Sequence, residues 1–95
     1  MVAWSRLAKK QLQDAYAYIK QDSLQNAEKV RDEIIDSTIA LDGKSGIYPP
    51  DKYRFNNDGS YRAFELHRFR ISYRVIKNTI LIVRLRHTRQ SPKKY

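Results

Sequence analysis

The chain has 95 residues, of which 41% are hydrophobic and 31% are charged, and its formal net charge at pH 7 is +9. This length allows one domain with one small core, and the hydrophobic content argues against a disordered chain. Cysteine is absent, which excludes disulfides and thiolate metal sites, and no stretch is apolar enough to span a membrane. Because the first residues also lack the apolar segment of a secretory signal, we expect a single domain over residues 1–95 in the cytoplasm.

The positive charge lies in the second part of the chain. Residues 1–42 contain six Lys or Arg and seven Asp or Glu, whereas residues 43–95 contain thirteen and three. Charge concentrated in one segment favours a polyanion or an acidic protein as partner. Ordinary solubilising surface charge is the alternative interpretation.

Two amphipathic helices are predicted in the first part, behind residues 1–4, which could form a short edge strand. Ser5 is a suitable N-cap for the first helix, and Ser23 for the second, which should end at Gly43. The short polar turn between the helices predicts an antiparallel hairpin. Apolar residues recur at three- and four-residue steps along each helix, and we expect them in the core: Trp4, Ala8, Leu12, Ala15 and Ile19, then Ala27, Val30, Ile34 and Leu41.

Residues 43–60 are predicted to form a loop. They contain all three glycines and two of the three prolines, and the adjacent Pro49 and Pro50 cannot donate backbone hydrogen bonds. The sequence Asn57-Asp58-Gly59 is typical of a turn. Loops of this length in small domains are often functional, and this one carries the cations Lys44, Lys52 and Arg54.

From Tyr61 onward the apolar periodicity changes to two, which predicts strands. The runs 61–66, 69–76 and 79–86 are joined by His67-Arg68 and Lys77-Asn78, each short enough for a hairpin. Alternation places Phe69, Ile71, Tyr73 and Val75 opposite Arg70, Ser72 and Arg74, and Leu81, Val83 and Leu85 opposite Ile82, Arg84 and Arg86. The predicted fold is therefore α+β: a small twisted, mainly antiparallel sheet, with an N-terminal helical hairpin packed on one face and arginines on the other.

The chemistry that the residues allow is that of a basic cluster. The two histidines have only Glu65 nearby and no metal-ligand spacing, so we expect no metal and no cofactor. Arginines can hold a phosphate, and His or Tyr can move protons, so the cluster could assist attack of an RNA 2′-hydroxyl on the adjacent phosphate without a metal. Each residue alone could equally be an ordinary strand residue, and the hypothesis requires that they converge in space: Arg62, Arg70, Arg74, Arg84, Arg86, His87, Arg89 and Tyr95.

Nearly the whole chain resembles the RelE/ParE superfamily of bacterial type II toxins. The resemblance is carried by the order of two helices, a Pro-rich loop and strands, and by the segments FRISYRV and HTRQSP. It implies an α+β fold and an antitoxin whose extended acidic segment wraps the toxin and covers its basic surface. RelE-like members cut mRNA in the ribosomal A site, whereas ParE-like members inhibit DNA gyrase and need no nuclease residues.

The resemblance assigns catalytic roles to four residues, Arg70, His87, Arg89 and Tyr95. Arg70 and Arg89 would hold the scissile phosphate, and Tyr95 or His87 would transfer protons. Where RelE-like members have a second basic residue on the preceding strand, this chain has Phe64. The favoured hypothesis is ribosome-dependent mRNA cleavage; a ParE-like gyrase inhibitor and a basic RNA-binding domain without toxicity are the alternatives. Nucleic-acid contacts are expected from Arg62, Arg74, Arg84, Arg86, Lys93 and Lys94.

Overall fold

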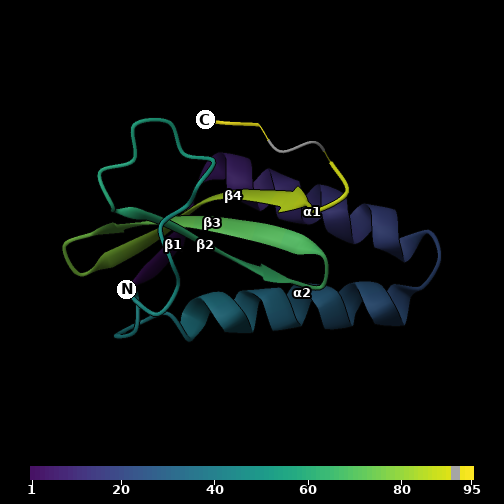
Figure 1. Cartoon of the computed structure of the whole chain (residues 1–95). Coiled ribbons are helices and arrows are strands. Elements are labelled where there is room, and N and C mark those ends of the chain that lie inside the picture. Colours follow the sequence, from purple (N-terminus) through teal and green to yellow (C-terminus); the bar gives the residue numbers. More distant parts are fainter. Residues whose placement is uncertain (91–92) are drawn as a thin grey trace.

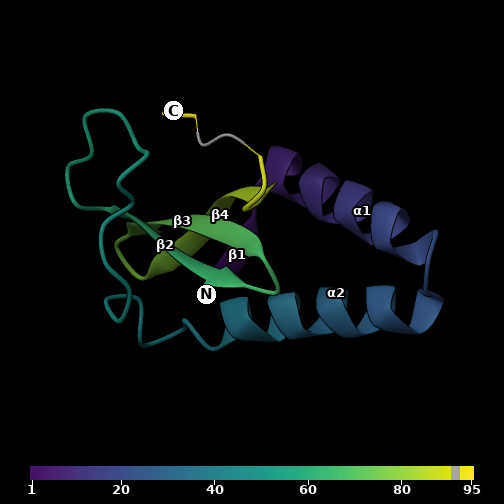
Figure 2. The same cartoon turned by 45° about the vertical axis from the view of Figure 1, so that its right-hand side comes forward.

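The computed structural model describes residues 1–90 and 93–95. The elements follow in the order β1 (Val2–Trp4), α1 (Arg6–Lys20), α2 (Leu24–Ile39), β2 (Tyr61–Leu66), β3 (Phe69–Ile76) and β4 (Thr79–His87). The two helices form an antiparallel hairpin whose turn projects beyond the sheet (Figures 1 and 2). This arrangement confirms the predicted α+β fold.

The sheet has the strand order β1-β4-β3-β2. Strands β2, β3 and β4 are antiparallel neighbours, and β1 pairs with β4 in parallel. Both residues of the β2–β3 turn, His67 and Arg68, have positive φ, as a two-residue type I′ hairpin requires. The sequence suggested that residues 1–4 form an edge strand, and the structure adds that this strand runs parallel to β4.

Both helices begin at the predicted serine caps, but α2 ends earlier than expected. The hydroxyl of Ser5 accepts a hydrogen bond from the Ala8 amide, and that of Ser23 accepts one from the Asn26 amide. Ile39 is the last residue of α2, and Gly43, with φ of +76°, belongs to the turn that follows. Leu41 is buried although it lies beyond the end of the helix. Because it continues the helical spacing of apolar residues, the sequence predicted a longer helix.

Replacing Ser5 with alanine is expected to lower the free energy of unfolding by about 1 kcal/mol, the usual cost of losing an N-cap. The Ser5 hydroxyl also donates to the Val83 carbonyl on β4 at 3.3 Å, so the same substitution loosens the join between α1 and the sheet. Urea unfolding of the wild type and the variant would measure the change. A stability equal to that of the wild type would show that the cap does not contribute.

A β-bulge in β4 changes which side chains share a face. Ser72 pairs with Arg84, but the next residue of β3, Tyr73, pairs with Ile82, so Val83 is the extra residue of β4. Ile82 is therefore fully buried in the core, although simple alternation grouped it with Arg84 and Arg86. The bulge brings Arg84 and Arg86 onto the face of the sheet that carries Arg70 and Ser72.

The core lies between the helical hairpin and one face of the sheet. Tyr73 is fully buried, and its hydroxyl donates to the Ser45 carbonyl at 2.7 Å, which ties the long loop to the core. The other buried members of the core come from both helices, the turn after α2 and three strands: Ala8, Val30, Ile34, Leu41, Phe64, Phe69, Ile71, Ile80, Ile82 and Leu85. In the part of the chain that the structure describes, no helix is long and apolar enough to cross a membrane.

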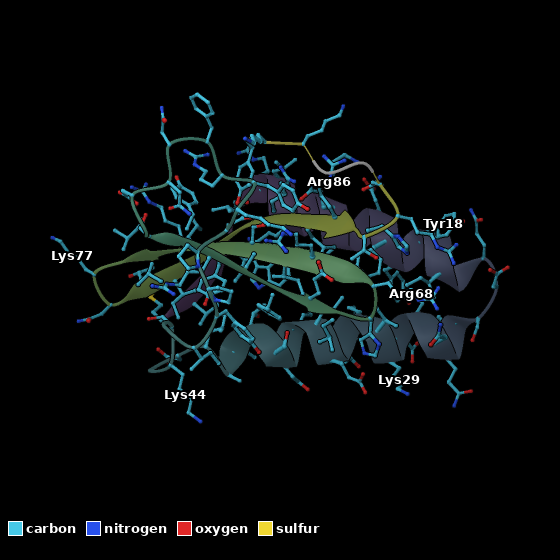
Figure 3. All side chains as sticks on the ribbon, viewed as in Figure 1. Tyr18, Lys29, Lys44, Arg68, Lys77 and Arg86 are labelled. Atoms are coloured by element: carbon cyan, nitrogen blue, oxygen red, sulfur yellow. The ribbon has the colours of Figure 1, made fainter. Side chains whose placement is uncertain are left out.

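The second face of the sheet carries Arg70, Arg84 and Arg86, as predicted, but other segments of the chain cover part of it. The second part of the loop between α2 and β2 lies with the C-terminal residues 93–95 on the side of the sheet away from α2 (Figures 1 and 2), and the Phe55 amide donates to the Tyr95 carbonyl. Arg84 is only 7% exposed. The exposed cations are distributed around the molecule instead, with Lys29, Lys44, Arg68 and Lys77 projecting in different directions (Figure 3).

Candidate functional site

A buried carboxylate of the loop, Asp51, lies over the covered face of the sheet and binds Arg70 of β3. Its side chain is 1% exposed. Oδ1 accepts hydrogen bonds from Arg70 Nη2 at 3.0 Å and from the Tyr53 amide at 3.1 Å, and Oδ2 accepts one from the Tyr95 hydroxyl at 2.6 Å. Asp51 thus joins a β3 arginine to a C-terminal tyrosine. We call Asp51, Arg70, Arg84 and Tyr95 the Asp51 cluster.

The prolines before Asp51 explain its position. Pro50 forms an isolated antiparallel bridge with Arg62, the Pro49 carbonyl accepts from the Ala63 amide, and the Asp51 amide donates to the Tyr61 carbonyl at 2.8 Å. This segment extends the edge of the sheet beside β2, a place where prolines are tolerated because no partner strand needs their amide protons. The extension carries the Asp51 side chain over β3, where it meets Arg70.

Arg84 completes the cluster through Tyr95. Its guanidinium lies 4.3 Å from the centroid of the Tyr95 ring, and Nη1 donates to the Lys93 carbonyl at 2.9 Å. Burial, together with the neighbouring Arg86, lowers the pKa of Arg84. A buried arginine stacked on an aromatic ring is a packing element that still carries its charge.

The pKa values of Asp51 and Tyr95 are shifted in opposite directions. Burial by itself would raise the pKa of Asp51, but hydrogen bonds from Tyr95, the Tyr53 amide and Arg70 outweigh it and hold this pKa below its usual value. Burial, and then the hydrogen bond to Asp51, raise the pKa of Tyr95 well above its usual value. At neutral pH the cluster therefore contains an ionised carboxylate and a protonated phenol.

The lowered pKa of Asp51 predicts a loss of stability in acid. As the pH falls below about 5, an unfolded aspartate with a pKa near 3.9 begins to bind a proton, while Asp51 in the folded chain stays ionised. Unfolding then takes up a proton, so the stabilisation from Asp51 is complete above this range and decreases as the pH falls. Urea unfolding from about pH 7 to 3 should show a stability difference between wild type and Asp51→Asn that narrows in acid. A difference that is constant with pH would contradict the lowered pKa.

A second feature is a groove between α1 and the end of β4. It has a volume of about 530 Å³ and is lined by Gln11, Asp14, Ala15, Tyr18, Phe69, Leu85, Arg86, His87, Arg89 and Gln90. The imidazole of His87 packs against Phe69, with 5.1 Å between ring centroids, and its Nδ1 accepts from the Arg89 amide at 3.0 Å. Arg86 and His87 also line a hollow of about 60 Å³ beside Arg70 and Arg84, and Figure 3 shows Arg86 on the side of the C-terminal segment.

The structure divides the four residues that were predicted to be catalytic into two pairs. Arg70 and Tyr95 share Asp51, whereas His87 and Arg89 are neighbours beside the groove, where Arg89 is exposed. Of the pair beside the groove, only His87 also lines the hollow that contains Arg70. The catalytic assignments therefore stay predictions, with their residues in two adjacent places.

The predicted nucleic-acid contacts are similarly dispersed. Arg62 donates to the Tyr48 carbonyl at 2.5 Å, and Arg74 donates to the Ser60 hydroxyl while lying 4.9 Å from the Tyr61 ring centroid. Lys93 and Lys94 are exposed. Phe64, which stands where RelE-like members have a basic residue, is buried and stacks on Tyr48 with 4.6 Å between ring centroids. At that position this chain has a core residue.

Asp51 is the residue that sequence reasoning missed. It lies in the predicted loop, directly after two prolines, where no functional role was expected of it. One signal was present: a segment with thirteen cations and three acidic residues has few counterions for any arginine that becomes buried. Elsewhere, His67 binds Glu33 on α2, and the described residues contain no group of three or more His, Asp or Glu that could hold a metal ion.

Comparisons with known proteins give concordant results. A family model described as the ParE toxin of type II toxin–antitoxin systems, parDE, matches residues 2–92. A solved structure of the chromosomal ParDE toxin–antitoxin system from P. aeruginosa aligns with a TM-score of 0.72 at 22% identity, over 90% of this chain and 92% of that one. A search among curated proteins finds no significant match.

Proposed function

Because the chain belongs to the ParE family of toxins from type II toxin–antitoxin systems, we propose that it arrests growth by inhibiting DNA gyrase through protein contacts. The predicted membership of the RelE/ParE superfamily is confirmed. Within that superfamily the sequence slightly favoured ribosome-dependent mRNA cleavage, and the geometry of the Asp51 cluster now favours the alternative.

The observation that carries this proposal is the state of Arg70 and Tyr95. The Arg70 guanidinium lies 3.0 Å from Asp51 and 3.4 Å from Glu65, so two carboxylates already neutralise the positive charge that would otherwise bind a scissile phosphate. The Tyr95 hydroxyl donates to Asp51, and its raised pKa keeps it protonated. A phenol in this state is a poor acceptor for the 2′-hydroxyl proton. Both residues instead stabilise the fold.

The position of Phe64 supports the same proposal. Proton transfer to and from RNA needs a second basic group near the phosphate, and the position that supplies it in RelE-like members here packs into the core. A ParE-like inhibitor needs no such group, because it acts by binding. The proton-transfer group that is missing at position 64 is one that a gyrase inhibitor does not need.

A toxin of a type II system has a cognate antitoxin, and the structure offers a surface suited to one. The lining of the groove between α1 and β4 combines apolar side chains such as Ala15, Phe69 and Leu85 with the cations Arg86 and Arg89. An acidic segment with a few apolar anchors would complement both features. We propose that the antitoxin is acidic and that it covers this groove.

Purified toxin is expected to inhibit DNA supercoiling by gyrase in a dose-dependent manner and to create no ribosome-dependent 5′ ends on mRNA. The antitoxin supplies the control, because adding it in excess should restore supercoiling. Primer extension on ribosome-bound mRNA tests the alternative in parallel. New 5′ ends together with unaffected gyrase would overturn the proposal and restore the nuclease hypothesis.

A further inference from the structure

The tip of the loop between α2 and β2, residues 52–56, carries an exposed aromatic side chain, Phe55. The residue is 64% exposed, and it lies in the loop that precedes β2. A single exposed apolar residue is ordinary on a protein surface. Phe55 is of interest because the backbone that carries it is fixed by many contacts, whereas such a tip is usually mobile.

The side chain of Asn57 fixes the base of this tip. Its Nδ2 donates to the carbonyls of Asp51, at 3.2 Å, and Tyr61, at 2.8 Å. Its Oδ1 accepts from the amides of Gly59, at 2.9 Å, and Tyr61, at 3.2 Å. One side chain therefore joins both ends of residues 51–61, and the left-handed φ of Asn56 and Gly59 sets the turn between them.

Backbone hydrogen bonds to Tyr95 fix the other side of the tip. The Tyr95 amide donates to the Tyr53 carbonyl at 2.9 Å, and the Phe55 amide donates to the Tyr95 carbonyl at 2.6 Å. The hydroxyl of Tyr95 is at the same time bound to the buried Asp51. The conformation of Phe55 is thus tied to the Asp51 cluster.

The surroundings of Phe55 are positively charged. The Arg54 guanidinium lies 4.0 Å from the Tyr61 ring centroid and 5.2 Å from that of Tyr95, and Lys52 lies 5.2 Å from the Tyr53 ring centroid. Between residues 50 and 60 the acidic side chains are Asp51, which is buried, and Asp58, which is exposed and bound to Ser60. A partner surface with acidic side chains around an apolar pocket would complement this tip.

We propose that the loop tip, defined as residues 52–56, binds the protein target of the toxin by placing Phe55 in an apolar pocket with an acidic border. The inference rests on the proposed function, because it assumes that the toxin acts by protein contacts. A rigid aromatic anchor loses little conformational entropy on binding, and anchors of this kind carry most of the affinity in many interfaces. The contacts of Asn57 and Tyr95 then serve to hold Phe55 in its binding position.

Growth arrest by three variants of the full chain tests this inference. Phe55→Ala should raise the toxin level needed for half-maximal arrest by roughly tenfold or more, the loss expected for truncating an interface anchor. Phe55→Leu keeps an apolar side chain of smaller volume and should keep most of the potency. Ile39→Ala, which alters a side chain 59% exposed at the end of α2, is the matched control and should act like the wild type. Thermal unfolding and antitoxin binding should be unchanged in all three.

The outcomes separate this inference from the choice of gyrase as the target. If Phe55→Ala arrests growth as well as the wild type, or loses antitoxin binding in parallel with toxicity, the loop tip does not bind the target. Equal loss in Phe55→Ala and Phe55→Leu would indicate stacking of the ring on nucleic-acid bases and would also overturn the inference. The choice of gyrase instead fails if wild-type toxin leaves supercoiling intact. Growth arrest that depends on an apolar residue 55 would then still support the loop tip, with a different protein as the target.

Discussion

Replacing Asp51 with alanine is expected to lower the free energy of unfolding by roughly 3–5 kcal/mol, the cost of breaking a buried ion pair by removing one partner. Within the described part of the chain, Arg70 would keep one carboxylate partner, the exposed Glu65 at 3.4 Å, and its contact with the Tyr53 ring. Among the described residues, Arg70 Nε is already a buried donor without a hydrogen-bond partner. Tyr95 and the Tyr53 amide would lose their acceptors as well. Denaturant unfolding at neutral pH would measure the loss.

Two further variants make this result interpretable. Asp36→Ala removes an exposed carboxylate from α2 and should change the free energy of unfolding by no more than about 0.5 kcal/mol. Adding Arg70→Met to Asp51→Ala should recover part of the stability, because the uncompensated guanidinium is removed. A loss below about 1 kcal/mol for Asp51→Ala would mean that water replaces the carboxylate, and the cluster would not be the main support of the loop.

The elements of the fold were predictable because they depend on local patterns. Ser5 and Ser23 precede apolar residues at helical spacing, and the alternation from Tyr61 onward is interrupted only at two hairpin turns. These signals gave the hairpin of helices and three of the four strands. The parallel pairing of β1 with β4 could not be predicted, since three residues carry too little pattern to choose a partner 78 positions away in the sequence.

The face of the sheet that carries the site was predicted less well, for two physical reasons. The bulge at Val83 shifts the alternation by one residue, and no side chain of β4 marks that position. The covering of the arginines depends on a contact between Asp51 and Arg70, which lie nineteen residues apart. Alternation identifies which residues share a face, but it does not say whether a loop will fold over that face.

The contact between Asp51 and Arg70 also bears on the candidate catalytic residues. The residue types of Arg70 and Tyr95 suit phosphate binding and proton transfer, and the two side chains do lie together. Their common partner is a carboxylate, which satisfies the guanidinium and holds the phenol proton. The sequence shows which reactions a side chain could take part in. Whether another side chain of the protein already binds it is seen only in the folded structure.

Replacing Tyr95 with phenylalanine should therefore separate structure from catalysis. The change removes one hydrogen bond to an ionised carboxylate, so we expect the free energy of unfolding to fall by about 1.5–3 kcal/mol. The ring remains available to Arg84 and Arg54. If the toxin acts by binding gyrase, Tyr95→Phe should still arrest growth and inhibit supercoiling at concentrations close to those of the wild type.

A destabilised control is needed, because a toxin that is partly unfolded would lose potency for reasons unrelated to chemistry. Ser5→Ala is suitable, since it removes the N-cap of α1, which lowers the stability of the fold, and leaves the hydrogen bonds of Tyr95 unchanged. Equal potency of the two variants would show that the Tyr95 hydroxyl takes no part in a reaction, and that the backbone hydrogen bonds of Tyr95, which Tyr95→Phe keeps, are enough to hold the loop tip. Loss of growth arrest in Tyr95→Phe, with potency retained in Ser5→Ala, would instead show that the hydroxyl takes part in a reaction. In that case RNA cleavage would have to be reconsidered, with Asp51 as the group that accepts the proton from Tyr95.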